Sequence, residues 1–420
     1  MTVSRIVELE GHIIDSGTMQ QAFEIVMDFD GEFDVEQFDV GRHKEAESYC
    51  RLAVRADDEP TLGSILHELH KIGATLTDPD DVTLEPAPRD RVVPAGFYST
   101  TNHPTKVKYD GEWIDVEPIE MDCAIVVDPE GGPDGGPRAY TKPLNAIDAG
   151  ELVATDETGI KVEPPERPRE AGGAFGFMQG GVSSERPSES LIGQVAEAIA
   201  ETNDRDGTVL AVPGPAVIHS GAGEALAALV REGYVDAISA GNGFATHDIE
   251  RNLYGTSLGM DVETLEHPRE GHKHHIYAIS EVSRAGGIDA AVENGTITGG
   301  VMYECVKHDR DYVIAGSIRD DGPLPETITD AVEAQDEIRR QAQEADLVLM
   351  FATLLHSVAV GNCLPSTTRV VCVDINPATV TQLLDRGSDQ AIGMVTDIGT
   401  FVPKLAEYVL DGDTDEPDSK

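Results

Sequence analysis

The sequence has few basic and few aromatic residues. Lys and Arg number 31 against 77 Asp and Glu, which gives 420 residues a formal net charge of −46, and Phe, Trp and Tyr make up 5%. So acidic a surface repels nucleic-acid phosphates and anionic lipid headgroups, so we expect neither nucleic acid nor a membrane as partner. Molar salt screens carboxylate repulsion beyond roughly 3 Å, so the acidic excess indicates a halophilic protein rather than a particular ligand.

Cysteines and long apolar segments are also scarce. No run of 18 apolar residues occurs, and the first ten residues lack the apolar segment of a signal peptide. The five cysteines are odd in number, are scattered along the chain and form no C-x-x-C pair. This argues against a disulfide framework or a cysteine zinc site. We therefore expect a soluble, cytoplasmic protein in a reducing compartment, whose cysteines are Cys50, Cys123, Cys305, Cys363 and Cys372.

Residues 1–88 alternate strand and helix periodicity. Apolar patterns predict strands at 6–14, 33–40, 50–54 and 82–84, with helices starting at Thr18 and at Pro60. This βαββαβ order is typical of a ferredoxin-like α+β module. Residues 89–180 lack helical periodicity and read as a small all-β module, with a type I′ hairpin at Asp110-Gly111 and a boundary near 164–173.

Residues 181–410 alternate short apolar runs with helical stretches. The pattern predicts helices at 221–233, 327–344 and 377–386, and residues 411–420 form an acidic tail that we expect to be disordered. Continuous apolar strands separated by helices indicate a parallel sheet buried on both faces, so this part is predicted to be a Rossmann-like α/β domain. The predicted strands are 208–212, 237–239, 312–315, 347–351, 369–373 and 393–395.

The ends of these strands are rich in small and polar residues. Ligands of open parallel sheets bind outside the carboxyl ends of the strands, and glycines and helix N-termini there suit a diphosphate. Asp374 could accept both hydroxyls of an adenosine ribose and would reject a 2′-phosphate, which favours NAD over NADP. Tight turns and a helix N-cap would explain the same residues. The segments are 213–215, 240–243, 316–322, 353–356, 374–377 and 396–397.

Familiar nucleotide and hydrolase motifs are missing or misplaced. Gly221-Ala222-Gly223 begins a G-x-G pattern, but Leu226 takes the third glycine position and Glu224 would repel a phosphate. No phosphate-binding P-loop pattern occurs. The G-x-S-x-G sequence at 255–259 follows a helical segment, whereas a nucleophile elbow must follow a strand. His267, His272, His274 and His275 fit no familiar zinc spacing, so we expect no metal.

Several charged groups outside the predicted sheet could contact a substrate. An α-amino acid needs a guanidinium group for its carboxylate and acids for its amines. Asp122 and Arg169 are of the right types, and surface ion pairs are the alternative explanation for each.

Longer motifs in both halves resemble a known family. ELEGHIID (8–15), PAGFY (94–98), WIDVE (113–117) and ERPRE (166–170) look like the region shared with lysine-ketoglutarate reductase/saccharopine dehydrogenase enzymes. SAGNG (239–243), HDIE (247–250), AGSIRDDGPLP (315–325) and VDINP (373–377) resemble archaeal-type ornithine cyclodeaminases and the cyclodeaminase half of cyanobacterial arginine dihydrolases. The sheet domain is similar to the NAD-binding fold of deoxyhypusine synthase, which lacks the usual glycine fingerprint.

The resemblance implies an ammonia-lyase that converts L-ornithine to L-proline with recycled NAD and takes part in ornithine metabolism, acting as a homo-oligomer. From residue type alone, we expect Asp122 to act as an acid or base near the δ-amine and Arg169 to bind the α-carboxylate. Two alternatives stay open: an amino-acid dehydrogenase or saccharopine-type reductase with net NAD turnover, and a non-enzymatic regulator that binds NAD or an amino acid. By position in the motifs, the predicted NAD-binding residues are Asn242, Gly243, Asp321, Thr353, Leu354, Leu355, His356, Asp374, Ile375, Asn376 and Asp397.

Overall fold

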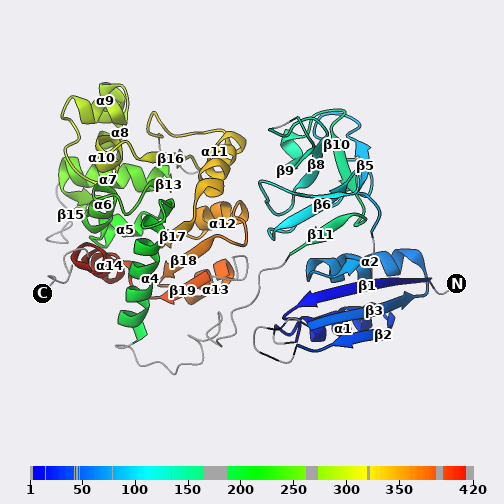
Figure 1. Cartoon of the computed structure of the whole chain (residues 1–420). Coiled ribbons are helices and arrows are strands. Elements are labelled where there is room, and N and C mark those ends of the chain that lie inside the picture. Colours follow the sequence, from blue (N-terminus) through cyan, green and yellow to red (C-terminus); the bar gives the residue numbers. More distant parts are fainter. Residues whose placement is uncertain are drawn as a thin grey trace, which may run out of the picture. The chain divides into compact units, whose positions relative to one another are not determined.

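The chain folds into two compact units in the computed structural model (Figure 1). One comprises Met1–Gly173 with Pro365–Thr367, and the other comprises Ala174–Leu364 with Thr368–Lys420. The structure describes residues 3–412 except 15, 42, 44, 45, 47, 78, 134, 164–186, 262–272, 319–321 and 385–390. The predicted boundary at 164–173 and the tail beyond 412 lie outside the described residues, and the domain limits at 88, 180 and 410 stay predictions.

The first unit begins with the predicted βαββαβ order. Its antiparallel sheet has the order β2-β3-β1-β4, which is the ferredoxin-like arrangement. Apolar side chains of α1 and α2, such as Val26 and Leu69, share a core with Leu52 of β3. The elements are β1 (Val3–Gly11), α1 (Thr18–Asp28), β2 (Glu32–Asp39), β3 (Ser48–Ala56), α2 (Glu59–Lys71) and β4 (Thr75–Leu76).

The strand predicted at 82–84 does not complete this sheet. It corresponds to β5 (Thr83–Pro86), which pairs with β10 (Leu152–Thr155) in a separate sheet of order β5-β10-β8-β9. A third sheet has the order β11-β6-β7, and its Asp110-Gly111 turn has φ values of 52° and 80°, as a type I′ hairpin requires. The remaining elements are β6 (Thr105–Tyr109), β7 (Glu112–Asp115), β8 (Ala124–Asp128), β9 (Arg138–Lys142), the 3₁₀ helix η1 (Leu144–Ala146) and β11 (Ile160–Val162).

The second unit contains a six-stranded parallel sheet of order β16-β13-β12-β17-β18-β19. Numbered along the chain this is 3-2-1-4-5-6, the doubly wound Rossmann order. The six apolar runs of the sequence all form strands, so the predicted fold class is confirmed. The strands are β12 (Val209–Pro213), β13 (Ala237–Gly241), β16 (Asp311–Ala315), β17 (Leu347–Phe351), β18 (Arg369–Asp374) and β19 (Ala391–Val395).

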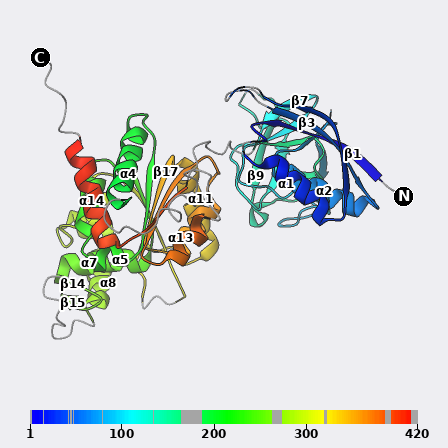
Figure 2. The same ribbon diagram turned by 90° about the horizontal axis from the view of Figure 1, so that it is seen from below.

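Helices cover both faces of this sheet, which explains the continuous apolar runs. Val209 and Ala211 of β12 enter one core, and Leu210 and Val212 enter the core on the opposite face. Figure 2 shows β17 between α4 and α14 on one side and α11 and α13 on the other. The helices are α4 (Pro187–Asn203), α5 (Ala216–His219), α6 (Gly223–Arg231), α7 (Asn242–Tyr254), α8 (His274–Ala285), α9 (Ile288–Glu293), α10 (Val301–Lys307), α11 (Ala331–Glu344), α12 (Leu355–Asn362), α13 (Pro377–Leu384) and α14 (Ile398–Gly412).

The helix predicted at 327–344 begins later, as α11. Ile328 lies beside β16, where it forms an isolated bridge with Ala315, and Asp330 then caps the helix by accepting from the N–H groups of Val332 and Glu333. Within the described residues, no helix is long and apolar enough to cross a membrane.

Candidate functional site

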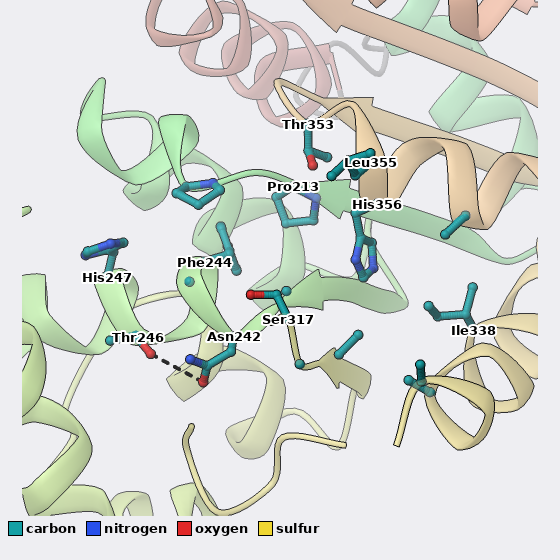
Figure 3. Close-up of a pocket in the computed structure, with 18 of the residues that line it drawn as sticks. Pro213, Asn242, Phe244, Thr246, His247, Ser317, Ile338, Thr353, Leu355 and His356 are labelled. Atoms are coloured by element: carbon teal, nitrogen blue, oxygen red, sulfur yellow. Dashed lines mark hydrogen bonds between the residues drawn. The ribbon is translucent and has the colours of Figure 1, made fainter. Parts of the chain in front are cut away.

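A pocket of about 980 Å³ lies at the carboxyl ends of β12, β13, β16 and β17 (Figure 3). The strand order reverses between β12 and β17, so the pocket lies at the topological switch point where doubly wound sheets bind ligands. Segments after all four strands contribute to it, together with α11 and the start of α8. Its lining includes Pro213, Asn242, Ser317, Ile338 and Thr353.

The chain makes a close backbone contact at the switch point. The N–H of Gly214, just after β12, donates to the carbonyl of Phe351 at the end of β17 over 2.7 Å. A Cβ atom at Gly214 would lie far inside contact distance of the Ala352 carbonyl oxygen, so glycine is required there. Ala352 itself has a φ of 52°, a left-handed conformation that is uncommon for residues other than glycine and is often found at functional sites.

The described lining of this pocket carries no Asp, Glu, Lys or Arg, although the chain contains 77 acidic residues. Its polar groups are hydroxyls, amides, imidazoles and backbone. An acidic lining would repel a diphosphate, so this composition suits an anionic ligand. The 13-residue helix α7 starts in the pocket directly after Gly241, which has no side chain to cap the helix, and the positive end of its dipole favours an anion.

Asn242 fixes the first turn of α7 against the segment that follows β16. Its Oδ1 atom accepts from the backbone N–H of Leu324 and the hydroxyl of Thr327, each over 3.0 Å. The residue is 5% exposed and lines the pocket. Asn242 therefore has a structural role in the pocket wall.

The structure brings together five of the predicted NAD-binding residues. Asn242, Gly243, Thr353, Leu355 and His356 all line the main pocket. Leu354 is the residue preceding α12, in its N-cap position. The side chains of Leu355 and Ile375, 84% and 72% exposed, offer apolar surface that a planar ring system could cover.

A smaller pocket of about 270 Å³ contains two more of the predicted residues, Ile375 and Asp397, beside His219 and Ala352. Asp374 and Asn376 form a local turn: Asp374 Oδ1 accepts from the Asn376 N–H over 2.8 Å, and Asn376 Oδ1 accepts from the Ala378 N–H over 3.0 Å. These residues therefore form the tight turn that was the alternative explanation for them. The turn uses one carboxylate oxygen of Asp374, and the second oxygen can accept from a ligand.

The remaining candidates lie elsewhere. Asp321 and Arg169 lie outside the described residues. Asp122 belongs to the first unit, where it is exposed in a turn with a φ of 57°. The next strand, β8, begins two residues later, at Ala124.

His356 is held inside the main pocket by one hydrogen bond, between its Nε2 and the hydroxyl of Ser239 over 3.0 Å. Burial lowers its pKa to about 4, so the imidazole is neutral near pH 7. A neutral ring tied to a hydroxyl can orient a ligand amide and does not add charge to the pocket.

Sequence reasoning missed a histidine–carboxylate pair on α7. His247 lines the pocket, and its Nδ1 lies 2.8 Å from Oε2 of Glu250, which is fully buried. The other oxygen of Glu250 accepts from the Thr256 hydroxyl over 2.8 Å and the Gly259 N–H over 2.9 Å. The spacing of three residues within HDIE is the signal that could have revealed the pair.

The G-x-S-x-G segment does not form a nucleophile elbow. Gly255 ends α7 in a left-handed conformation, and Thr256–Ser257 (β14) pairs with Met260–Asp261 (β15) in a small hairpin. Of the four clustered histidines, His267 and His272 lie outside the described residues. Among the residues that are described, no group of three His, Cys, Asp or Glu could hold a metal ion.

The doubly wound order and the pocket at its switch point define the class: a Rossmann-like nucleotide-binding domain preceded by two smaller modules. Family models match along nearly the whole chain: the LOR/SDH bifunctional enzyme conserved region at 4–103, the first C-terminal region of the ArgZ-like arginine dihydrolases at 104–192, and their C-terminal Rossmann fold at 193–405.

The chain belongs to the family of archaeal ornithine cyclodeaminases and ArgZ-like enzymes. It is 52% identical over 402 residues to the ornithine cyclodeaminase of Methanopyrus kandleri, covering 96% of both chains. It is 43% identical to the bifunctional arginine dihydrolase/ornithine cyclodeaminase AgrE of Nostoc, covering 97% of this chain and 58% of AgrE.

Two solved structures agree with this assignment. A conserved putative LOR/SDH protein from Methanococcus maripaludis, 49% identical, matches with a TM-score of 0.74 over 80% of this chain and 99% of its own. The ternary complex of AgrE with ornithine and NAD⁺, 42% identical, matches with a TM-score of 0.53 over 98% of this chain and 59% of AgrE.

Proposed function

We propose that the protein is an NAD-dependent ornithine cyclodeaminase, an ammonia-lyase that converts L-ornithine to L-proline and ammonia. One observation supports it most: the described lining of the switch-point pocket lacks carboxylates in a chain of net charge −46. A relative in the same family, AgrE, is solved with ornithine and NAD⁺ bound.

The residues of the pocket fit a dinucleotide. The uncapped start of α7 faces a diphosphate, with Asn242 and Gly243 in its first turn. Thr353, Leu354, Leu355 and His356 border the nicotinamide end of NAD, and Asp374, Ile375, Asn376 and Asp397 border its adenosine end. Asp321 completes this set, and Asp374 accepts the ribose hydroxyls.

When bound, NAD⁺ supplies a hydride acceptor for C2 of ornithine and returns the same hydride to the cyclic imine, so no net oxidation results. The protein aligns C2, excludes water and moves protons on two amines. Asp122 serves the δ-amine and Arg169 binds the α-carboxylate. The enzyme works as a homo-oligomer in a salt-rich cytoplasm and contributes to proline biosynthesis.

The test is turnover of L-ornithine in high salt with NAD⁺ far below the substrate concentration. Ammonia and proline should form in equal amounts, with many turnovers for each NAD⁺ added. Accumulation of NADH in proportion to product would instead indicate a dehydrogenase or saccharopine-type reductase. Binding of NAD without turnover would indicate a regulator.

A further inference from the structure

Imidazoles are the titratable groups of the main pocket. The described residues that line it include three histidines, His247, His275 and His356, and no Asp, Glu, Lys or Arg. Figure 3 places His247 and His356 on different sides of Asn242 and Ser317. His356 is hydrogen-bonded to Ser239, and burial lowers its pKa, so it is a poor proton acceptor.

His247 differs from the other two because a buried carboxylate fixes its tautomer. Burial raises the pKa of Glu250, but hydrogen bonds from His247, the Gly259 N–H and Thr256 outweigh it and lower that pKa below its usual value. Glu250 is therefore ionised and can only accept hydrogen bonds. The Nδ1 atom of His247 must then carry the proton, which leaves the lone pair of the neutral ring on Nε2.

The donors to Glu250 are themselves fixed. The single hydroxyl proton of Thr256 is donated to Glu250 Oε1, so the 2.8 Å contact between Thr256 and His274 requires His274 Nδ1 to donate. The donor and the acceptor are thus defined for each hydrogen bond in the chain His274–Thr256–Glu250–His247. The carboxylate cannot rotate to release His247 without breaking two other hydrogen bonds.

The groups facing His247 are His219 on α5, His275 on α8 and Glu250 on its own helix. The rings of His219 and His275 have centroids 4.8 Å and 6.3 Å from that of His247. Burial and the charge of a protonated His247 lower the pKa of His219 to about 4, and its Nδ1 lies 2.5 Å from the Ser257 hydroxyl. His219 therefore stays neutral when His247 is protonated.

We propose that His247 is the general base of the reaction and that Glu250 is its positioning residue, an inference that rests on the proposed function. Ornithine binds with a protonated α-amine, which cannot support loss of hydride from C2. The N–H bond breaks, its electron pair stays on the α-nitrogen, and the proton forms a new bond to His247 Nε2. The imidazolium returns that proton to the α-nitrogen when this nitrogen departs as ammonia.

The experiment compares His247→Gln with a matched control, His308→Gln. His308, the residue that caps the C-terminus of α10, also contacts a glutamate, Glu304 of that helix at 3.2 Å, but it lies outside the pocket and its side chain is 39% exposed. We expect kcat of His247→Gln to fall by at least about 10²-fold, with the affinity for NAD unchanged in a fluorescence titration. The His308→Gln variant should match the wild type in both measurements.

Two further variants separate proton transfer from a structural effect. His247→Ala should regain activity when imidazole is added, in proportion to neutral imidazole. In Glu250→Gln the amide oxygen still accepts from Thr256 and Gly259, so its NH₂ group faces His247 Nδ1 and moves the ring proton to Nε2. We expect that wrong tautomer to lower kcat by on the order of 10²-fold or more without loss of NAD affinity.

The proposal is overturned if His247→Gln keeps a wild-type kcat, if its loss of activity accompanies loss of NAD binding, or if imidazole fails to rescue His247→Ala. A wild-type enzyme that makes no proline from ornithine would overturn the proposed function instead. That outcome is measured before any variant is made, so the two failures cannot be confused.

Discussion

The Oδ1 atom of Asn242 accepts a hydrogen bond from the hydroxyl of Thr327 over 3.0 Å, and this bond joins the first turn of α7 to the segment that follows β16. The same Asn242 oxygen accepts from the Leu324 N–H, so one buried amide holds two strand-end segments together. The wall of the pocket and the start of α7 are thus positioned by a single side chain.

Asn242→Asp tests this arrangement because it keeps the accepting oxygen and adds a negative charge. We expect the fold to be retained and the affinity for NAD to fall about tenfold, or about 1.4 kcal/mol, since the described lining has no other acid. The measurement is a fluorescence titration with NAD, and thermal unfolding without NAD is the control. Unchanged NAD affinity would show that the diphosphate is bound elsewhere.

Asp374→Ala tests the ribose contact. If the free carboxylate oxygen binds the ribose hydroxyls, NAD affinity should fall by about 1–3 kcal/mol, as measured by calorimetry. Because Asp374 also accepts from the Asn376 N–H, Asp374→Asn is the control that keeps this turn acceptor. A loss of thermal stability in the Ala variant at constant NAD affinity would leave Asp374 with the turn role alone.

The burial of His356 predicts a pH dependence of stability. Its pKa is about 4 in the folded protein and about 6.5 when unfolded, so its contribution is complete above pH 6.5 and is lost as pH falls toward 4. Between pH 6.5 and 5 we expect His356→Gln to lose about 2 kcal/mol less unfolding free energy than the wild type. Urea unfolding at both pH values, without NAD, measures this.

Other buried titratable groups do not affect the difference between the wild type and His356→Gln, because both proteins contain them. The pKa of His219 is also about 4, so this residue, like His356, destabilises the fold as the pH falls. Burial raises the pKa of Asp248 to about 6, so its contribution is gained rather than lost as pH falls through 6. Parallel curves for the wild type and His356→Gln would contradict the assignment of the pH dependence to His356.

The acidic surface predicts a dependence of stability on salt. With 77 acidic and 31 basic residues, most carboxylates have no basic partner, and their repulsion extends over roughly 10 Å at 0.1 M salt. We expect Tm to rise steadily as KCl is raised toward about 2 M, where the screening length falls below roughly 3 Å. Sucrose at matched osmolality is the control, and equal effects of sugar and salt would argue against charge screening.

The sheet of the second unit could be predicted because its strands are buried on both faces. Alternate residues such as Val209 and Leu210 enter different cores, so each strand is an unbroken apolar run. Element ends were less predictable where pairing is not local. Ile328 has an apolar side chain suited to a helix, yet it lies beside Ala315 at the sheet edge. Likewise, β5 pairs with β10, some 70 residues along the chain.

The candidate site was only partly accessible to the same reasoning. The strand-end loops pointed to Asn242, Gly243, Thr353, Leu355 and His356, which all line the main pocket. The roles of His247 and Glu250 depend on Thr256 and Gly259, whose positions no local pattern fixes. Asp248, the neighbouring acid, has a different role: its buried carboxylate accepts from the Met302 N–H at the start of α10.

The absence of acidic and basic side chains from the described lining of the switch-point pocket has a consequence for how salt affects ligand binding. Salt screens the attraction between an anionic ligand and a lysine or arginine side chain, so sites that rely on such residues weaken as the ionic strength rises. The backbone N–H groups at the start of α7 bear no net charge. If backbone groups at the start of α7 hold NAD, its affinity should change little over the range of salt concentration in which the acidic surface becomes screened.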